Sequence, residues 1–240
     1  MACCCFSVTG KIKEKMVSKE IKGILFDAYG TLFDIASIDP RLEQLCGEKA
    51  PAVAELWRRK QLEYSWLRTL MVRYVDFYDL TRDALSYALE TFGLEVSSAD
   101  KQALMQEYYH LKAFPDVREA LGLLKGKYHL AILSNANPSL LERATSFNGL
   151  DEILDDYISA DELQLYKPVP AIYQLPEKKL RLAPWNLLFV SANTWDVAGA
   201  AACGLQVAWV KRQEAIPEKL GLKPDVIVKD LLQLARLILK

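Results

Sequence analysis

Short apolar runs of strand length alternate with helical patterns along most of this chain, and this alternation limits the possible folds more than any other feature. The apolar runs lie at residues 21–27, 128–134, 187–191, 206–210 and 225–228. Helical patterns begin at Pro138 and at Pro170, and a stretch rich in small residues stops at Gly204. Strands that alternate with helices usually pair in parallel and are covered on both faces. The sequence therefore predicts an α/β fold with an open parallel sheet.

One long segment interrupts the alternation. Between residues 35 and 113 there is no convincing strand, and apolar residues recur at three- and four-residue steps as far as Tyr74. Thr81 and Ser98 are predicted to cap two further helices. Because a crossover between parallel strands is usually much shorter than about 80 residues, we predict an inserted, all-helical cap domain. The predicted domains are the core, 21–34 and 114–240, and the cap, 35–113.

Composition and charge exclude several classes of protein. The 30 Lys and Arg residues nearly balance the 31 Asp and Glu residues, for a net charge of −1, which argues against a nucleic-acid partner. No apolar run approaches the ~18 to 20 residues of a membrane span, so we expect no membrane partner either. The five cysteines, three of them at 3–5, do not form a disulfide pattern, which favours the cytoplasm. Residues 1–20 are predicted to be a disordered tail, with Met16 as an alternative start.

Polar residues stand where three of the predicted strands end: Asp27, Ser134 and Ser191. Taken singly, an Asp after a strand is more often a turn or helix-cap residue. In an open parallel sheet, however, ligands bind outside the carboxyl ends of the strands. Further polar residues follow close to these or other element ends: Asn135, Lys167, Asn193 and Asp196. Together these residues indicate a functional site.

Four motifs resemble those of the haloacid dehalogenase superfamily, in the same order. They are FDAYGTL at 26–32, which resembles the nucleophile motif, LSN at 133–135, YKP at 166–168 and SANTWD at 191–196. The helical insert stands where that superfamily places a cap, so the resemblance implies a Rossmann-like core with an inserted helical cap. More narrowly, WRRKQLEY at 57–64 and WLR at 66–68 are similar to the L-2-haloacid dehalogenases. The likeness extends from about residue 21 to about residue 230.

The chain departs from the phosphatases of that superfamily in two ways. Phosphatases carry a second Asp two residues after the nucleophile, to protonate an alcohol leaving group, and here Tyr29 stands at that position. A halide is so weak a base that it leaves unprotonated. Phosphatases also hold Mg²⁺ with acidic residues around the fourth motif, where this chain has only Asp196. We therefore expect no metal and no other cofactor.

The resemblance implies hydrolysis of (S)-2-haloalkanoic acids to (R)-2-hydroxy acids with inversion, through an ester on Asp27. The substrates are then a small 2-haloacid and water. The catalytic residues implied are Asp27, Thr31, Arg58, Lys167, Asn193 and Asp196. The substrate-binding residues implied are Ala28, Tyr29, Arg58, Leu62, Phe77, Ser134, Asn135, Tyr173, Ser191 and Trp195.

These residues divide into groups by their implied role. Arg58, Asn135 and Trp195 would hold the halide, since a guanidinium meets anionic charge without a proton transfer. Ser134 and the backbone N–H groups of Ala28 and Tyr29 would hold the substrate carboxylate. Lys167 would orient Asp27, while Asp196 and Asn193 would steer the water. Leu62 and Phe77 would form an apolar pocket, and Thr31, Tyr173 and Ser191 would support the others.

Simpler interpretations stay open. A charge run such as Arg58-Arg59-Lys60 is typical of a solvated helix face, and Leu62 and Phe77 are also typical of plain cap packing. The alternatives for the whole protein are a phosphatase of the same superfamily and a non-catalytic binding protein on this fold. The resemblance also implies a homodimer joined through cap helices. Chain-length and halogen preference are not predictable from these residues.

Overall fold

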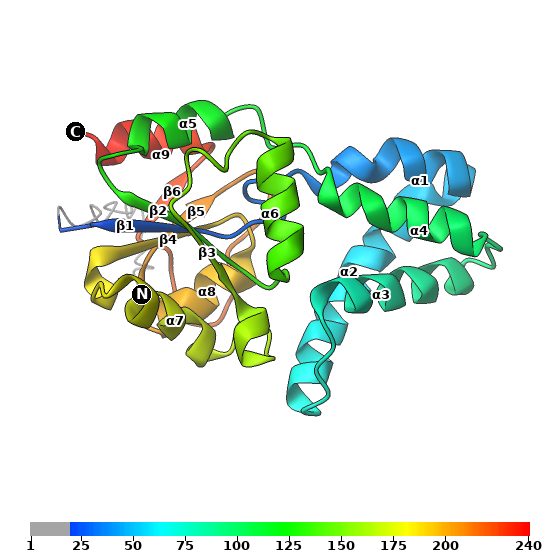
Figure 1. The fold of residues 1–240 in the computed structure, drawn as a ribbon. Helices are drawn as coiled ribbons and strands as arrows, with labels where there is room; N and C mark the ends of the chain where they lie inside the picture. The colour runs from blue at the N-terminus through cyan, green and yellow to red at the C-terminus, as the bar shows by residue number, and fades with distance from the viewer. Residues whose placement is uncertain (1–19) are drawn as a thin grey trace, which may run out of the picture.

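The structure is a computed structural model and describes residues 20–240. The predicted tail, with Met16 and the cysteines at 3–5, lies outside the described residues except for Glu20. The chain forms a sheet flanked by helices and, at one end of it, a smaller group of helices (Figure 1).

Six parallel strands make the sheet. They are β1 (Gly23–Phe26), β2 (His129–Ser134), β3 (Asp156–Ser159), β4 (Leu187–Ser191), β5 (Gln206–Val210) and β6 (Val226–Val228), in the order β3-β2-β1-β4-β5-β6. The central strand is β1, where Phe26 pairs with Ile132 on one side and Val190 on the other. The carboxyl ends of β1, β2 and β4 are therefore neighbours. They lie where the strand order reverses, which is the usual ligand site of such a sheet.

Side chains of the strands alternate between two buried faces, as the pleat requires. Ile24 and Phe26 point to one face, and Leu25 points to the other. The first face is covered by α5 (Val117–Leu124), α6 (Pro138–Phe147) and α9 (Leu231–Ile238). The second is covered by α7 (Pro170–Leu180) and α8 (Thr194–Ala202). Because both faces are buried, the strands are continuous apolar runs, and this is why they could be recognised in the sequence.

The cap is built from four helices. They are α1 (Asp39–Cys46), α2 (Ala50–Leu70), α3 (Phe77–Thr91) and α4 (Ser98–Gln106), with short 3₁₀ turns at Ile35–Ile38, Gly47–Lys49 and Glu107–Tyr109. The chain leaves and re-enters the sheet through two adjacent segments, since Phe33 bridges to Ala113 and the Phe114 amide donates to the Leu32 carbonyl at 3.0 Å. The predicted fold class, a parallel α/β sheet with an inserted helical cap, is confirmed.

Several local predictions about the cap and the sheet were wrong. Thr81 does not cap a helix: Asp76 caps α3 by accepting from the Asp79 amide, and Thr81 lies in the helix interior. Ser97, one residue before the predicted Ser98, caps α4. Helix α2 ends at Leu70, so Tyr74 lies in the following loop. Neither α1 nor β3 was predicted, because α1 is short and buries only Leu42 and Cys46, and the β3 sequence, DYIS, is short and half polar.

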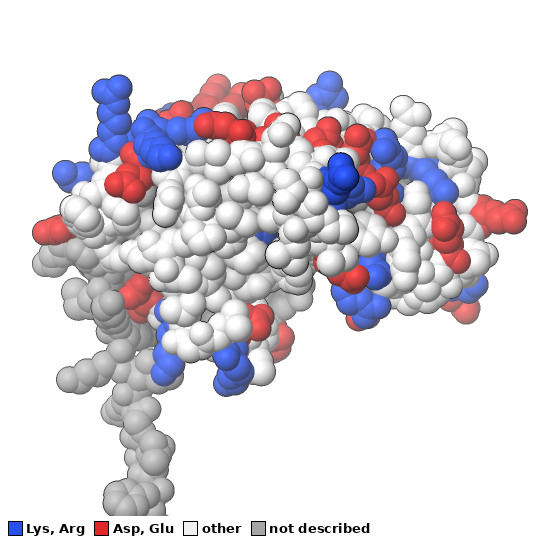
Figure 2. Space-filling view, turned by 90° about the horizontal axis from the view of Figure 1, so that it is seen from below, with Lys and Arg blue, Asp and Glu red and all other residues white. Residues whose placement is uncertain are grey.

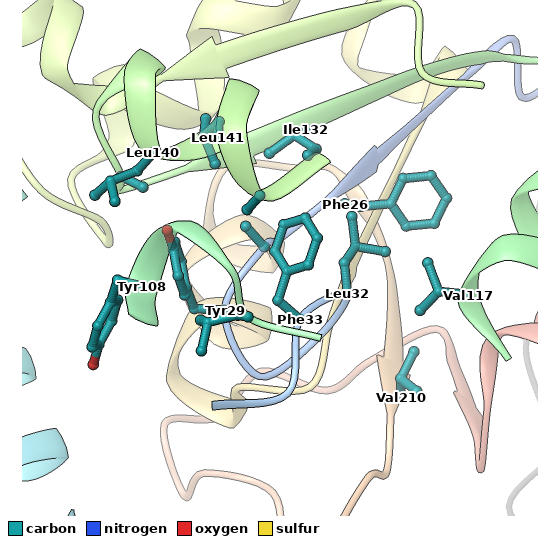
Figure 3. Close-up of a cluster of buried hydrophobic side chains, with 14 of the residues drawn as sticks. Phe26, Tyr29, Leu32, Phe33, Tyr108, Val117, Ile132, Leu140, Leu141 and Val210 are labelled. Atoms are coloured by element: carbon teal, nitrogen blue, oxygen red, sulfur yellow. The ribbon is translucent and has the colours of Figure 1, made fainter. Parts of the chain in front are cut away.

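One continuous apolar core joins the cap to the first face of the sheet. Phe26 at the end of β1 is buried together with Leu32 and Phe33 of the loop that follows it, and Tyr29 of the same loop lies beside Tyr108 of the cap (Figure 3). This packing anchors the loop that carries Asp27.

Charged side chains of both signs lie next to one another at the margins of the face in Figure 2, and most of that face is uncharged. Within residues 20–240, the helices are all too short or too polar to cross a membrane.

Candidate active site

Asp27 directly follows the central strand and is held by hydrogen bonds on one side. Its Oδ2 accepts from Asn193 Nδ2 at 2.7 Å, from Thr31 Oγ1 at 3.0 Å and from Ser191 Oγ at 3.3 Å. Its Oδ1 is contacted, among the described residues, only by Lys167 Nζ at 3.3 Å. A carboxylate with one oxygen held by three donors and the other less engaged has a defined direction. Oδ1 is the oxygen available to react.

A tight turn after β1 brings Thr31 back to Asp27. The Ala28 carbonyl accepts from the Leu32 and Phe33 amides, and Gly30 adopts a φ of +83°, in the left-handed region that favours glycine. Thr31 Oγ1 donates to Asp27 and accepts from the Ala192 amide at 2.8 Å, so it links the loops after β1 and β4.

The same turn leaves two backbone amides free. Among the described residues, the N–H groups of Ala28 and Tyr29 donate to no acceptor, and both residues are buried. A buried unpaired amide is costly unless a ligand or water satisfies it. These two donors lie beside Asp27, where they suit an anionic group such as a carboxylate.

Lys167 is fully buried among three oxygen acceptors. Its Nζ lies 2.6 Å from the Leu133 carbonyl, 2.9 Å from Asp196 Oδ2 and 3.3 Å from Asp27 Oδ1. The backbone amide of Lys167 donates to Asn135 Oδ1 at 2.8 Å, which fixes this segment to the end of β2. A buried ammonium needs such complete pairing. Lys167 therefore joins the two carboxylates into one charged cluster.

Asp196, at the start of α8, is fully buried and tied to the neighbouring helix α7 on the same face of the sheet. Tyr173 Oη donates to its Oδ1 at 2.6 Å. Burial raises the pKa of Asp196 to about 6, against the lowering effect of Lys167, and the nearby Asp27 adds to the increase. Ser191 Oγ lies 3.3 Å from both Asp196 Oδ2 and Asp27 Oδ2. Since a hydroxyl has one proton, it can donate to only one of them at a time.

Arg58 reaches the cluster from the cap. Its Nη2 lies 3.5 Å from Asn193 Oδ1, while its Nη1 donates to Gln61 Oε1 at 2.5 Å. Burial lowers the pKa of Arg58, while Tyr108, Asp27 and Asp196 raise it. Of the Arg58-Arg59-Lys60 run, Arg59 is exposed, so the solvated-face interpretation describes this residue. The Lys60 side chain is only 16% exposed, pairs with Glu63 and lies 4.5 Å from the centroid of the Tyr87 ring.

Aromatic side chains pack around Tyr29, and a cavity lies beside Asn193, which donates to Asp27. Tyr29 lies against Phe77 and Tyr108, with ring centroids 5.5 and 5.8 Å apart. Leu62 lines a cavity of about 410 Å³ together with Arg58, Asn193 and Trp195. Within residues 20–240, the Tyr29 hydroxyl and the Trp195 indole N–H are both buried without a hydrogen-bond partner. They are further polar groups that a ligand can satisfy.

Ser134 and Asn135 stand at the end of β2, and both are buried. Ser134 Oγ accepts from the Ala136 amide at 3.1 Å. Because Asn135 uses its oxygen to accept from Lys167, its amide nitrogen is left for a ligand.

A family model described as haloacid dehalogenase-like hydrolase matches residues 21–204. This chain belongs to the haloacid dehalogenase-like hydrolases.

Individual relatives of this hydrolase are similar over almost their whole length. The (S)-2-haloacid dehalogenase 2 of Pseudomonas sp. (strain CBS-3) is 41% identical over 225 residues, which are 92% of this chain and 96% of the relative. The (S)-2-haloacid dehalogenase 4A of Burkholderia cepacia is 45% identical over 199 residues, 82% of this chain and 86% of the relative.

A solved structure of the L-2-haloacid dehalogenase from Xanthobacter autotrophicus, with chloropropionic acid covalently bound, superimposes with a TM-score of 0.87. It is 37% identical and covers 91% of this chain and 98% of that chain.

The structure also shows contacts beside the candidate site that sequence reasoning did not find. Gln61, which accepts from Arg58, stands three residues later on the same helix face, and this spacing was the available signal. Arg212 Nη2 donates to the Thr31 carbonyl at 2.9 Å and its Nη1 pairs with Asp116 at 2.6 Å. No local pattern marked Arg212, since its partners are far away in the sequence.

In the part of the chain that the structure describes, no three His, Cys, Asp or Glu side chains are grouped so as to hold a metal ion.

Proposed function

We propose that this hydrolase removes the halogen from (S)-2-haloalkanoic acids and releases (R)-2-hydroxy acids. The observation that carries the proposal is Asp27, oriented by four hydrogen-bonding side chains, one of which, Asn193, lines a cavity together with Arg58 and Leu62 of the cap. Similarity to (S)-2-haloacid dehalogenases over most of the chain supports the same substrate class.

In the first step, Asp27 Oδ1 attacks C2 from the face opposite the halogen. A C–O bond forms as the carbon–halogen bond breaks, the bonding electrons leave with the halide, and C2 is inverted. The free amides of Ala28 and Tyr29 hold the substrate carboxylate. Arg58, with the Asn135 amide and the Trp195 indole N–H, stabilises the departing halide. Leu62 and Phe77 contact the alkyl part of the substrate.

In the second step, water attacks Cγ of the Asp27 ester. Asn193 and Asp196 steer the water, and the pKa of Asp196 near 6 allows this carboxylate to accept a proton close to neutral pH. The ester bond then breaks at the Asp27 carbonyl, the hydroxy acid takes a proton on its new oxygen, and Asp27 is restored. One halide and one proton are released in each cycle. Thr31, Ser191 and Tyr173 keep the two carboxylates in place.

Tyr29 favours this reaction over phosphate-ester hydrolysis. A phosphatase needs an acid at that position, and burial raises the pKa of the Tyr29 hydroxyl well above its ordinary value, which makes it a poor proton donor. We propose that the enzyme needs no metal ion. Activity should survive EDTA, and a strict Mg²⁺ requirement would overturn this part of the proposal.

We further propose a cytoplasmic homodimer joined through the cap. Large apolar side chains are exposed around the end of α2: Trp66, Leu67, Leu70, Met71 and Val72. Such a patch is typical of an interface. Sedimentation of the wild-type protein should give a dimer and Leu70→Glu a monomer, and a wild-type monomer at micromolar concentration would argue against the interface. Reduced cysteines, as Cys46 and Cys203 are here, suit the cytoplasm, which fractionation of cells would check.

The covalent step is tested by single-turnover hydrolysis of L-2-chloropropionate in H₂¹⁸O with excess enzyme. The label should appear in the Asp27 carboxylate and be absent from the first product released. Label found directly in the product would contradict an ester intermediate. Asp27→Asn, which keeps the shape of the side chain, is the inactive control.

A further inference from the structure

One amide side chain is buried between α2 and α3, in a part of the cap that is otherwise mainly apolar. Gln61 is completely buried, and so are Leu80, Ala84 and Leu85 of α3. A buried amide costs free energy unless all of its polar atoms find partners. The hydrogen bonds of Gln61 lead toward the active site.

A chain of hydrogen bonds runs from α3 through Gln61 to Arg58. The Thr81 hydroxyl donates to the Phe77 carbonyl at 2.6 Å, and Gln61 Nε2 donates to Thr81 Oγ1 at 2.7 Å. Gln61 Oε1 then accepts from Arg58 Nη1 at 2.5 Å. A longer contact of 3.4 Å joins Gln61 Nε2 to the Tyr108 hydroxyl.

The direction of this chain is determined by its two ends. The Phe77 carbonyl can only accept, so the Thr81 hydroxyl gives its proton there and has only lone pairs to offer Gln61. Gln61 must therefore present its NH₂ group to Thr81. Its oxygen then faces Arg58, which can only donate. The orientation of the Gln61 amide follows from the chemistry of its neighbours alone.

We propose that Gln61 and Thr81 are positioning residues that hold the Arg58 guanidinium in the place where it stabilises the leaving halide. Asp27 and Asp196 both attract Arg58. Unless something on the cap side holds it, the guanidinium can turn toward Asp27 and pair with the oxygen that must attack. Gln61 supplies a neutral acceptor, which holds one end of the guanidinium without cancelling its charge. This inference rests on the proposed dehalogenase reaction.

The test compares Thr81→Val, which removes the hydroxyl but keeps the shape, with Thr81→Ser, which keeps the hydroxyl. The readout is the single-turnover rate of Asp27 alkylation by L-2-chloropropionate and by L-2-bromopropionate. Thr81→Val should slow the chloride reaction about tenfold and the bromide reaction less, because chloride is the poorer leaving group and depends more on Arg58. Thr81→Ser should behave like the wild type.

Thr145→Val is the matched control. Thr145 is also fully buried in a helix and donates to the carbonyl four residues before it, at 2.8 Å, but it has no link to Arg58. It should leave both rates and their ratio unchanged. A loss of rate in Thr145→Val equal to that in Thr81→Val, or a wild-type rate and ratio in Thr81→Val, would overturn the inference.

If Thr81→Val does not fold, Gln61→Glu tests whether Gln61 positions Arg58. A carboxylate at this position would pair with Arg58, cancel its charge and weaken inhibition by added bromide about tenfold or more. Unchanged inhibition by bromide would reject the positioning role. If the wild-type enzyme itself is inactive toward both haloacids, the proposed function fails, which is a different result from an active wild type and an unaffected Thr81→Val.

Discussion

Removing the Tyr173 hydroxyl should shift the pH dependence of turnover. Tyr173 Oη donates to Asp196 Oδ1 at 2.6 Å, and this contact lowers the pKa of Asp196, which burial has raised to about 6. In the proposed reaction the ionised form of Asp196 steers the water, so turnover should fall as the pH drops through about 6. In Tyr173→Phe the ionised form loses a partner, so the acid side of the profile should move to higher pH.

The size of the shift follows from the environment of Asp196. A hydrogen bond to a charged group contributes about 1.5–3 kcal/mol, and 1.36 kcal/mol corresponds to about one pKa unit. Because Asp196 is completely buried, water cannot replace the lost donor without rearrangement. We expect an upward shift of about one to two units, so that turnover near pH 6 falls by about one order of magnitude.

The assay is kcat for L-2-chloropropionate between about pH 5 and about pH 9. Tyr128→Phe removes a hydroxyl that donates to the Ile238 carbonyl, far from Asp196 in the sequence and with no contact to it, and should leave the profile unchanged. Gly199→Ala should act in the same direction as Tyr173→Phe, since a Cβ at Gly199 would lie 2.6 Å from Tyr173 Oη. An unshifted acid side in Tyr173→Phe would refute the assignment of this titration to Asp196.

Three further predictions concern the same buried cluster. Lys167→Met should lower the free energy of unfolding by about 3–5 kcal/mol and abolish turnover, because it leaves the Asp27 and Asp196 carboxylates without their shared cation. Urea unfolding measures this change, and a loss of stability below about 1 kcal/mol would contradict the prediction. The raised pKa of Asp196 means that the folded state binds the proton of this group more tightly than the unfolded state does. The resulting stabilisation, on the order of 3 kcal/mol, is complete below the ordinary pKa of 3.8 and is lost as the pH rises through about 6. Asp196→Asn should flatten that part of the stability–pH curve, and an unchanged slope would reject the linkage. Arg212→Gln should lower the free energy of unfolding by about 1–3 kcal/mol and slow the alkylation of Asp27, because the ion pair with Asp116 and the hydrogen bond to the Thr31 carbonyl are lost. If only the stability changed, Arg212 would have no role in positioning Asp27.

Local sequence patterns were sufficient to predict a strand where the strand is long enough and buried on both faces. The apolar runs before Asp27 and up to Ser134 and Ser191 could be recognised because a parallel sheet buries every side chain of such strands. β3 was missed because its sequence, DYIS, is half polar and lies at the edge of the sheet. Thr81 was misassigned as a cap because a hydroxyl residue suits a helix start as well as a bond to the preceding turn.

The sequence by itself determined which residues end the strands and, through its motifs, the family and the order of the candidate groups. Only the tertiary structure decided which atoms meet. Asp196 accepts a hydrogen bond from Tyr173 on α7, and Thr31 accepts one from the amide of Ala192. On the cap side, Arg58 donates to Gln61. The physical reason is that hydrogen bonds and ion pairs act over a few ångströms, whereas their partners here include residues more than a hundred positions apart. Packing of the sheet and the cap is what brings those positions together, and no local pattern records it.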